Sequence, residues 1–160
     1  LISMTQYYDV IEKKTAVLFS GILKCLGIEL SLPQKDLEEL KQLGLSFGRA
    51  FQINDDLSDF EDSKLTGKAE YKDLSEGKLT LPVIFLMENK NESEQGEIFK
   101  FIDTGNFDAV KQLMKDTNSF NRARAEREKA IGNCIEYTKR FIKLDRLDSL
   151  KAFLEKTLIA

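Results

Sequence analysis

Apolar residues recur at helical spacing along almost the whole of this 160-residue chain, and this periodicity restricts the possible folds more than any other feature. No segment shows the sustained apolar–polar alternation of a β-strand, and there are only two prolines. We predict an all-α fold in a single unit, residues 1–160, without a linker or internal repeat. Helices are predicted at residues 4–27, 33–62, 79–86, 97–102, 107–115, 120–142 and 146–159, with a loop at 63–78 and a polar connection at 89–96.

The first two predicted helices each carry an apolar stripe that should face the interior. Lys14 lies on the first stripe, where it either binds an anion or extends its ammonium group to solvent. Thr15 and Gln52 lie beside the stripes and need polar partners, although a helical threonine often bonds to its own preceding turn. The stripes are Tyr7, Ile11, Leu18, Ile22 and Cys25, then Leu37, Leu40, Gly44, Phe47 and Phe51; Gly44 and Gly48 would let a neighbouring helix or a ligand approach the backbone.

Composition excludes several classes of function. The chain has no histidine, which removes the usual general base and the usual zinc ligand. A net charge of −3 gives no general reason to bind nucleic acid. No apolar run approaches the roughly 20 residues of a transmembrane helix. The N-terminus lacks signal-peptide features, and Cys25 and Cys134 are interpreted as buried reduced thiols, so we expect a cytoplasmic protein.

Three aspartates lie within five residues at the end of the second predicted helix: Asp55, Asp56 and Asp59. Asp55 and Asp59 are four apart and share a helix face, and Asp55 continues the buried stripe from Phe51. Crowded carboxylates repel each other unless a cation relieves them, and Mg²⁺ prefers such hard oxygen ligands together with substrate phosphates. The alternative is a solvated acidic helix end. The inward face and the lysines in neighbouring segments favour a magnesium–diphosphate site.

Two lysines in the loop after the acidic cluster each follow a glycine: Lys68 and Lys78. Both can supply positive charge to a diphosphate, although loop lysines are usually solvated. Asp73 and Glu76 in the same loop are expected to pair with surface lysines. A second basic group alternates with glutamates and is expected to form a salt-bridged helix face: Arg122, Arg124 and Arg127 with Glu126 and Glu128.

Three segments together resemble the second half of the trans-isoprenyl diphosphate synthases, the family of farnesyl, geranylgeranyl and longer polyprenyl diphosphate synthases. Their order and spacing fit that family, and the combination is far more specific than one aspartate-rich motif. The resemblance implies an antiparallel helix bundle of the isoprenoid synthase type, of which this chain would be an incomplete, C-terminal portion. The segments are Tyr8 to Phe19 (YDVIEKKTAVLF), Gly44 to Asp59 (GLSFGRAFQINDDLSD) and Gly67 to Ile84 (GKAEYKDLSEGKLTLPVI).

The resemblance also implies an activity: a Mg²⁺-dependent prenyltransferase that condenses an allylic diphosphate with isopentenyl diphosphate by ionisation, condensation and proton loss. It implies Asp55 as a metal ligand, with Asp56 and Asp59 holding ligand geometry or metal-bound water. The other implied roles are diphosphate binding by Lys14 and Lys68, oxygens of Thr15 and Gln52 facing the carbocation, Phe51 beside the isopentenyl group, and Lys78 as a further cation.

The family's first aspartate-rich motif does not occur in these 160 residues. We therefore expect the chain alone to bind Mg²⁺ weakly and to be inactive. Lys14, Gln52 and Asp55 should converge on one cleft, open on one side and flanked by exposed apolar surface. The full-length protein is expected to be a homodimer. The alternatives are a non-catalytic subunit or remnant of a heteromeric prenyl synthase, and a helical interaction domain.

Overall fold

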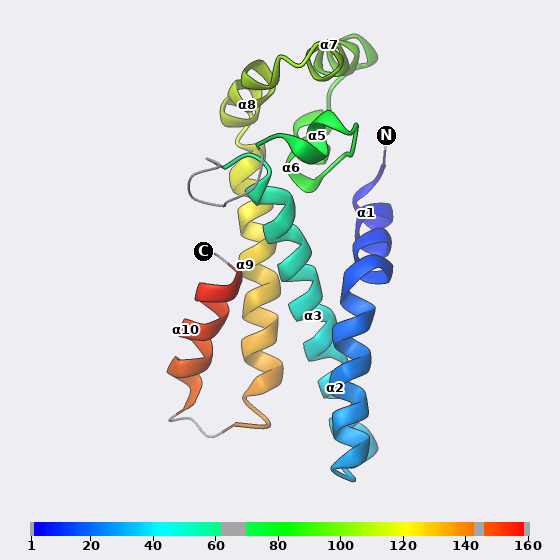
Figure 1. The fold of residues 1–160 in the computed structure, drawn as a ribbon, viewed down its shortest axis with the longest axis vertical. Coiled ribbons are helices and arrows are strands. Elements are labelled where there is room, and N and C mark those ends of the chain that lie inside the picture. Colours follow the sequence, from blue (N-terminus) through cyan, green and yellow to red (C-terminus); the bar gives the residue numbers. More distant parts are fainter. Residues whose placement is uncertain (1, 62–69, 143–145, 159–160) are drawn as a thin grey trace. The chain divides into compact units, whose positions relative to one another are not determined.

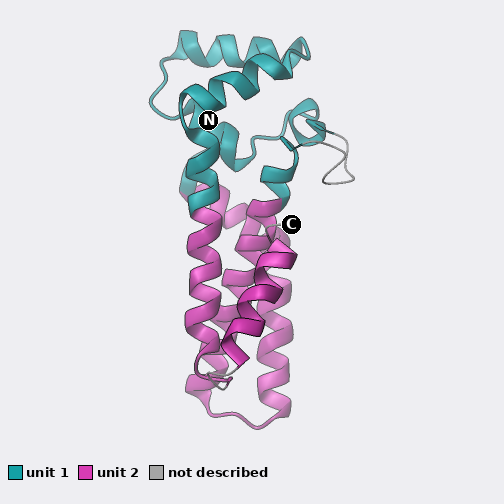
Figure 2. Ribbon diagram, turned by 90° about the vertical axis from the view of Figure 1, so that its left-hand side faces the viewer, with its two compact units in different colours: residues 1–4, 55–125 teal, residues 5–54, 126–160 magenta. Residues whose placement is uncertain are grey.

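The computed structural model describes residues 2–61, 70–142 and 146–158, and these residues contain helices and turns but no β-strand. The all-α prediction is therefore confirmed. The chain divides into two compact units: unit 1, residues 1–4 and 55–125, and unit 2, residues 5–54 and 126–160 (Figure 2). The single unit expected over residues 1–160 stays a prediction. None of the helices in the described ranges is long and apolar enough to cross a membrane.

Unit 2 contains the long helices of the fold, and consecutive ones run antiparallel. The helices are α1 (Met4–Ile11), a π-helical turn η1 (Glu12–Ala16), α2 (Val17–Glu29), α3 (Gln34–Ser58), α9 (Ser119–Thr138) and α10 (Leu147–Leu158). The first helix, which consists of α1, η1 and α2, is joined to α3 by a tight turn at Leu30–Pro33 (Figure 1). Helices α3 and α9 each continue into unit 1 at one end.

Two glycines of α3 allow the first helix to approach its backbone closely. A Cβ atom on Gly44 would lie 2.5 Å from the Cα atom of Ser20. One on Gly48 would lie 2.3 Å from the Cα atom of Ala16. These neighbours are backbone atoms that cannot rotate away, so only glycine fits at either position. The close approach predicted from the glycine spacing is confirmed, and the two pairs define an antiparallel register.

The π-helical turn η1 changes which face of the first helix is buried. A π turn holds one more residue than an α turn, so the residues after it are rotated about the helix axis. The buried positions run from Ile11 to Ala16 and Ser20, whereas Leu18 and Ile22 are 64% and 56% exposed. The predicted stripe is therefore wrong beyond Ile11. A strict 3.6-residue repeat could not include the extra residue.

The two cysteines lie in different environments, so the prediction that both are buried is wrong for one of them. Cys25 is exposed and Cys134 is buried, both as free thiols. Burial raises the pKa of the Cys134 thiol to about 12. Cys134 belongs to the core of unit 2, where α3, α9 and α10 meet; the other buried members are Ala50, Ala130, Ile131, Leu154 and Leu158.

Unit 1 contains the shorter helices, packed around a separate core. They are α5 (Lys72–Ser75), α6 (Leu81–Met87), α7 (Glu92–Asp103) and α8 (Phe107–Asp116). The strongly apolar α6 is buried along its whole length, as expected, with Pro82 in its first turn. The buried core residues are Phe60, Leu74, Val83, Leu86, Met87, Ile98, Ile102, Val110 and Met114.

Three predicted boundaries in unit 1 are wrong. Helix α3 ends at Ser58 rather than residue 62, and α5 lies within the predicted 63–78 loop. Helix α7 begins at Glu92, inside the predicted polar connection, because Asn91 and Glu94 form a capping box. The Glu94 amide donates to Asn91 Oδ1 at 3.0 Å, and the Asn91 amide donates to Glu94 Oε2 at 2.9 Å.

Candidate active site

The aspartates at the end of α3 differ in burial, and the difference does not follow the predicted face. Asp56 and Asp59 are 4% and 6% exposed, whereas Asp55 is only partly buried. The prediction that Asp55 and Asp59 form the inward pair is therefore wrong: the buried pair is Asp56 and Asp59. The phase was extrapolated from Phe51, which is itself 43% exposed.

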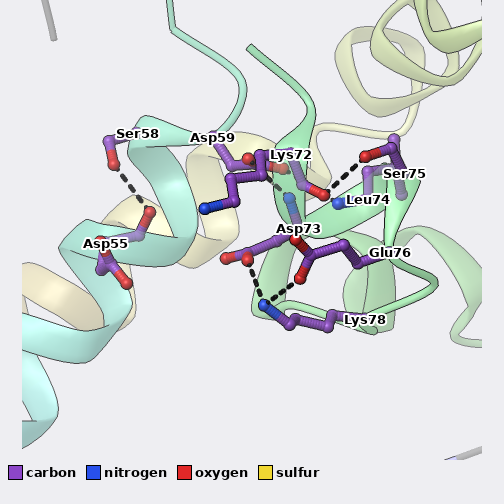
Figure 3. Close-up of polar contacts among 9 residues, drawn as sticks. All are labelled: Asp55, Ser58, Asp59, Lys72, Asp73, Leu74, Ser75, Glu76 and Lys78. Atoms are coloured by element: carbon purple, nitrogen blue, oxygen red, sulfur yellow. Dashed lines mark hydrogen bonds and ion pairs between the residues drawn. The ribbon is translucent and has the colours of Figure 1, made fainter. Parts of the chain in front are cut away.

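Asp59 holds the segment that begins α5 (Figure 3). Its carboxylate accepts hydrogen bonds from the amides of Asp73 at 3.0 Å and Leu74 at 3.2 Å, which lie in the first turn of α5. Its main-chain carbonyl accepts from the amide of Tyr71 at 2.7 Å, a residue with a left-handed backbone (φ 57°). Burial raises the pKa of the Asp59 carboxyl, although the amide hydrogen bonds oppose this shift. Asp59 therefore has a structural role in unit 1.

Asp56 has a similar structural role at the start of α6. Its Oδ2 atom accepts a hydrogen bond from the amide of Leu81 at 3.1 Å. That amide is at the start of α6 and has no partner within the helix, so the carboxylate satisfies it and interacts favourably with the helix dipole. The adjacent Thr80 hydroxyl is buried and has no hydrogen-bond partner among the described residues. Asp56 and Asp59 together tie the end of α3 to α6 and α5.

Asp55 is the partly exposed carboxylate of the three. Its main-chain carbonyl accepts from Ser58 Oγ at 2.7 Å, within the last turn of α3 (Figure 3). Within the described residues, no group of three or more acidic, cysteine or histidine side chains could hold a metal ion. Mg²⁺ is usually bound through one or two carboxylates together with substrate phosphates rather than by a complete protein cage. An accessible Asp55 beside two fixed aspartates fits that mode.

In unit 2, the π-helical turn and α3 are connected by a polar contact. Thr15 Oγ1 donates a hydrogen bond to Gln52 Oε1 at 2.7 Å. The alternative in which Thr15 bonds only to its own helical turn is therefore wrong. Gln52 is buried, which agrees with its predicted place beside the stripe. The contact lies next to the Gly48–Ala16 approach, which brings the two backbones together.

Lys14 and Phe51 are more exposed than the stripes predicted. Lys14 immediately precedes Thr15 in η1 and is exposed, so its predicted inner-face position is wrong, again because of the π turn. Several apolar side chains of the same helix are also exposed: Val10, Val17, Leu18, Ile22 and Leu26. The convergence of Lys14 and Gln52 with Asp55 stays a prediction, because the first two belong to unit 2 and Asp55 to unit 1.

The two loop lysines have different outcomes. Lys78 forms ion pairs with Asp73 and Glu76, each at 2.7 Å (Figure 3). The pairing expected for these two acids is therefore confirmed. Hydrogen bonds to them raise the pKa of the Lys78 ammonium group. Lys68 lies outside the described residues.

The arginines of α9 form salt bridges, as expected, but mostly with partners from other elements. Arg122 pairs with Glu88, and Arg124 pairs with Glu61 at 3.6 Å. Arg127 pairs with its neighbour Glu128 at 3.0 Å, is only 6% exposed, and donates to Asn54 Oδ1 at 2.7 Å. The Asn54–Arg127 contact was missed from the sequence. A buried arginine between glutamates gives no local sign of a partner 73 residues away.

Comparisons with known proteins agree with the resemblance. A family model described as polyprenyl synthetase matches residues 1–117. The chain is 34% identical over 139 residues to octaprenyl diphosphate synthase from Escherichia coli, covering 81% of this chain and 43% of the relative. It is 34% identical over 108 residues to geranylgeranyl diphosphate synthase from Sulfolobus acidocaldarius, covering 67% of this chain and 32% of that relative.

Solved structures of similar fold cover nearly the whole chain. A decaprenyl diphosphate synthase from Rhodobacter capsulatus aligns with a TM-score of 0.85 and 25% identity, over 99% of this chain and 50% of that one. An octaprenyl pyrophosphate synthase from Helicobacter pylori aligns with a TM-score of 0.79 and 28% identity, over 95% and 50%. The chain thus spans about half the length of the proteins it matches.

Proposed function

Because the chain belongs to the polyprenyl synthetase family, we propose that it carries part of the active site of a trans-prenyl diphosphate synthase. The proposed reaction condenses an allylic diphosphate with isopentenyl diphosphate. Relatives named as octaprenyl and geranylgeranyl diphosphate synthases support this substrate class. The activity is proposed for the protein as its organism expresses it, since the matches cover 43% and 32% of the two relatives and 50% of the two solved structures.

The proposal rests on the different environments of the three aspartates at the end of α3. Asp56 and Asp59 accept hydrogen bonds from backbone amides of α6 and α5, which fixes the end of α3. Asp55 stays partly exposed in the last turn of the same helix. We assign Asp55 as the Mg²⁺ ligand, with Asp56 and Asp59 as positioning residues. Bound Mg²⁺ would act as a Lewis acid on the allylic diphosphate.

The remaining site residues are assigned by the charge that each can stabilise. The ammonium groups of Lys14 and Lys68 bind the diphosphate, with Lys78 as a further cation that first has to exchange its pairs with Asp73 and Glu76. The oxygens of Thr15 and Gln52 are held by their mutual hydrogen bond, and such fixed dipoles stabilise a nearby carbocation without reorganising. The Phe51 ring, partly exposed, packs beside the isopentenyl group.

The test is Asp55→Ala in the expressed protein. Product formation from the two diphosphates should fall by a factor of about 10³ or more. The affinity for Mg²⁺ in the presence of diphosphate should fall in parallel, as measured by calorimetry. The control is Asp103→Ala, which removes an exposed carboxylate from α7 and should leave both quantities unchanged. Wild-type turnover in Asp55→Ala would exclude Asp55 as the ligand.

A second measurement addresses the chain alone. Because the first aspartate-rich motif does not occur in these residues, we expect no turnover by the 160-residue chain and weak Mg²⁺ binding. Turnover restored only by a different protein carrying that motif would favour a heteromeric synthase subunit. A helical interaction domain would show neither Mg²⁺ dependence nor an effect of Asp55→Ala. We also propose that the full-length protein is a homodimer, which its sedimentation tests.

A further inference from the structure

A cavity in unit 1 has a chemical character of its own, distinct from the candidate active site. It has a volume of about 370 Å³ and lies between the turn after α3, helix α8 and the start of α9. None of its lining residues was assigned a role in prenyl transfer. They are Phe60, Glu61, Lys111, Met114, Lys115, Phe120, Asn121 and Arg124.

The floor of this cavity is aromatic and apolar. The rings of Phe60 and Phe120 meet edge to face, with centroids 6.3 Å apart. Met114 is buried beside them in the core of unit 1. The guanidinium group of Arg124 lies over the Phe120 ring, 4.7 Å from its centroid. Such a floor provides ring faces and edges for a flat or apolar group to pack against.

The rim of the cavity is cationic, although the chain as a whole carries a net charge of −3. Three cations and one carboxylate line it, and the carboxylate, Glu61, pairs with Arg124 at 3.6 Å. Lys111 and Lys115 are four residues apart on α8, which places their like charges on one helix face. Among the described residues, neither lysine has a carboxylate within ion-pair distance. Within the part of the chain that the structure describes, these two positive charges therefore have no ion-pair partner.

The helix dipole explains the position of only one of these two lysines. Lys115 lies in the last turn of α8, where a cation interacts favourably with the helix dipole. Lys111 lies more than a turn before the end of the helix, and its ammonium group is 5.6 Å from the centroid of the Tyr71 ring. That contact leaves the charge available to an anion at the cavity rim.

We propose that this cavity binds an amphiphilic anion: a small molecule with an apolar or flat body and a phosphate or diphosphate group. The body packs against Phe60, Phe120 and Met114, and the phosphate oxygens accept hydrogen bonds from Lys111 and Lys115. The volume lies in the range of small-molecule sites. A prenyl diphosphate and a nucleoside diphosphate share this chemistry. The site goes beyond the proposed function, because none of its residues takes part in it.

The absence of tryptophan from the chain allows a site-specific reporter. Phe120→Trp places the only indole of the 160-residue chain in the cavity floor. Geranyl diphosphate, adenosine diphosphate and inorganic diphosphate are titrated separately without Mg²⁺. We expect saturable fluorescence changes, with at least one organic diphosphate binding about tenfold or more tightly than inorganic diphosphate. The ligand with the higher affinity identifies the source of the anion.

Charge variants of the unsubstituted chain test the rim without depending on the reporter. Measured by calorimetry, Lys111→Gln and Lys115→Gln should each weaken binding about tenfold. Lys156→Gln removes the same charge from an exposed position on α10 and should change nothing. Neither rim variant changes a residue of the candidate active site, so the result is independent of the prenyl transfer test. Equal binding of inorganic diphosphate, no effect of the two rim variants, or no binding at all would overturn the proposal.

Discussion

The two units hold their candidate functional residues by opposite means. In unit 2, the polar pair Thr15–Gln52 lies where two helix backbones meet at glycine, and no added atom fits. In unit 1, the end of α3 is tied to later segments by the carboxylates of Asp56 and Asp59, which accept from backbone amides. The helix contact in unit 2 therefore requires that no side-chain atoms be present at the glycines. The end of α3 in unit 1 requires the carboxylate oxygens of two aspartates.

This difference between the two units predicts which substitutions each should tolerate. A methyl group added at the helix contact of unit 2 has to push a backbone aside, because close-packed interiors do not yield. A carboxylate removed from unit 1 leaves buried amides without acceptors, and each such amide costs about 1–3 kcal/mol. The following experiments apply these changes separately, with unit 2 monitored through the buried Cys134 thiol.

The largest effect is expected from Gly48→Ala. Its Cβ atom would lie 2.3 Å from the Cα atom of Ala16, so we expect unfolding free energy to fall by about 3 kcal/mol. Labelling of Cys134 by a thiol reagent should accelerate by about a hundredfold. The control is Gly21→Ala, on α2, where a Cβ atom meets nothing within 4 Å; it should stabilise the helix by about 0.5–1 kcal/mol. Destabilisation of equal size by both would contradict the close-packing explanation.

The next largest effect is expected from Asp59→Ala. It removes the acceptor of the Asp73 and Leu74 amides, and we expect a loss of about 2 kcal/mol in unfolding free energy. Hydrogen exchange at these two amides should accelerate most. Asp103→Ala, an exposed position in the same unit, is the control. If Cys134 labelling accelerates as much in Asp59→Ala as in Gly48→Ala, the two units unfold together and the comparison fails.

Thr15→Val tests whether the polar contact of unit 2 adds to the stability that the close helix packing provides. It preserves the side-chain shape and removes the hydrogen bond to Gln52, so we expect a loss of about 1 kcal/mol. Thr157→Val, at an exposed position of α10, is the control. Thermal melting of each variant gives the value. A cost as large as that of Gly48→Ala would mean that the hydrogen bond, rather than glycine packing, holds the two helices together.

The smallest effect is a pH dependence in unit 1. Burial raises the pKa of the Asp59 carboxyl above its ordinary value of 3.8, so the folded state binds the proton more tightly than the unfolded state. The proton-linked part of the Asp59 contribution to stability is then complete below pH 3.8 and is lost as pH rises through the raised pKa, whereas the carboxylate continues to accept from the two amides. The unfolding free energy of wild type minus that of Asp59→Asn should fall over this range. A difference that rises with pH would reverse the assigned direction of the shift.

Much of the fold was predictable because its signals are local. The helical repeats of α3 and α6, the glycines at positions 44 and 48, and Pro82 in a first turn act through neighbouring residues. The family motif was also readable, since it is a combination of short segments. The π turn at Glu12–Ala16 and the capping box at Asn91 were missed. The first adds a residue to the repeat, and the second begins with Asn rather than the Ser or Thr that is typical of a capping box.

The acidic cluster separates what the sequence determines from what only the tertiary structure determines. The sequence by itself determined an all-α chain, close glycine contacts between its first two long helices, and three aspartates at one helix end. Only the tertiary structure decided which aspartates are buried, because their partners lie 14 to 25 residues away along the chain. Helical phase records which residues share a face, whereas burial depends on which distant backbone amides reach that face.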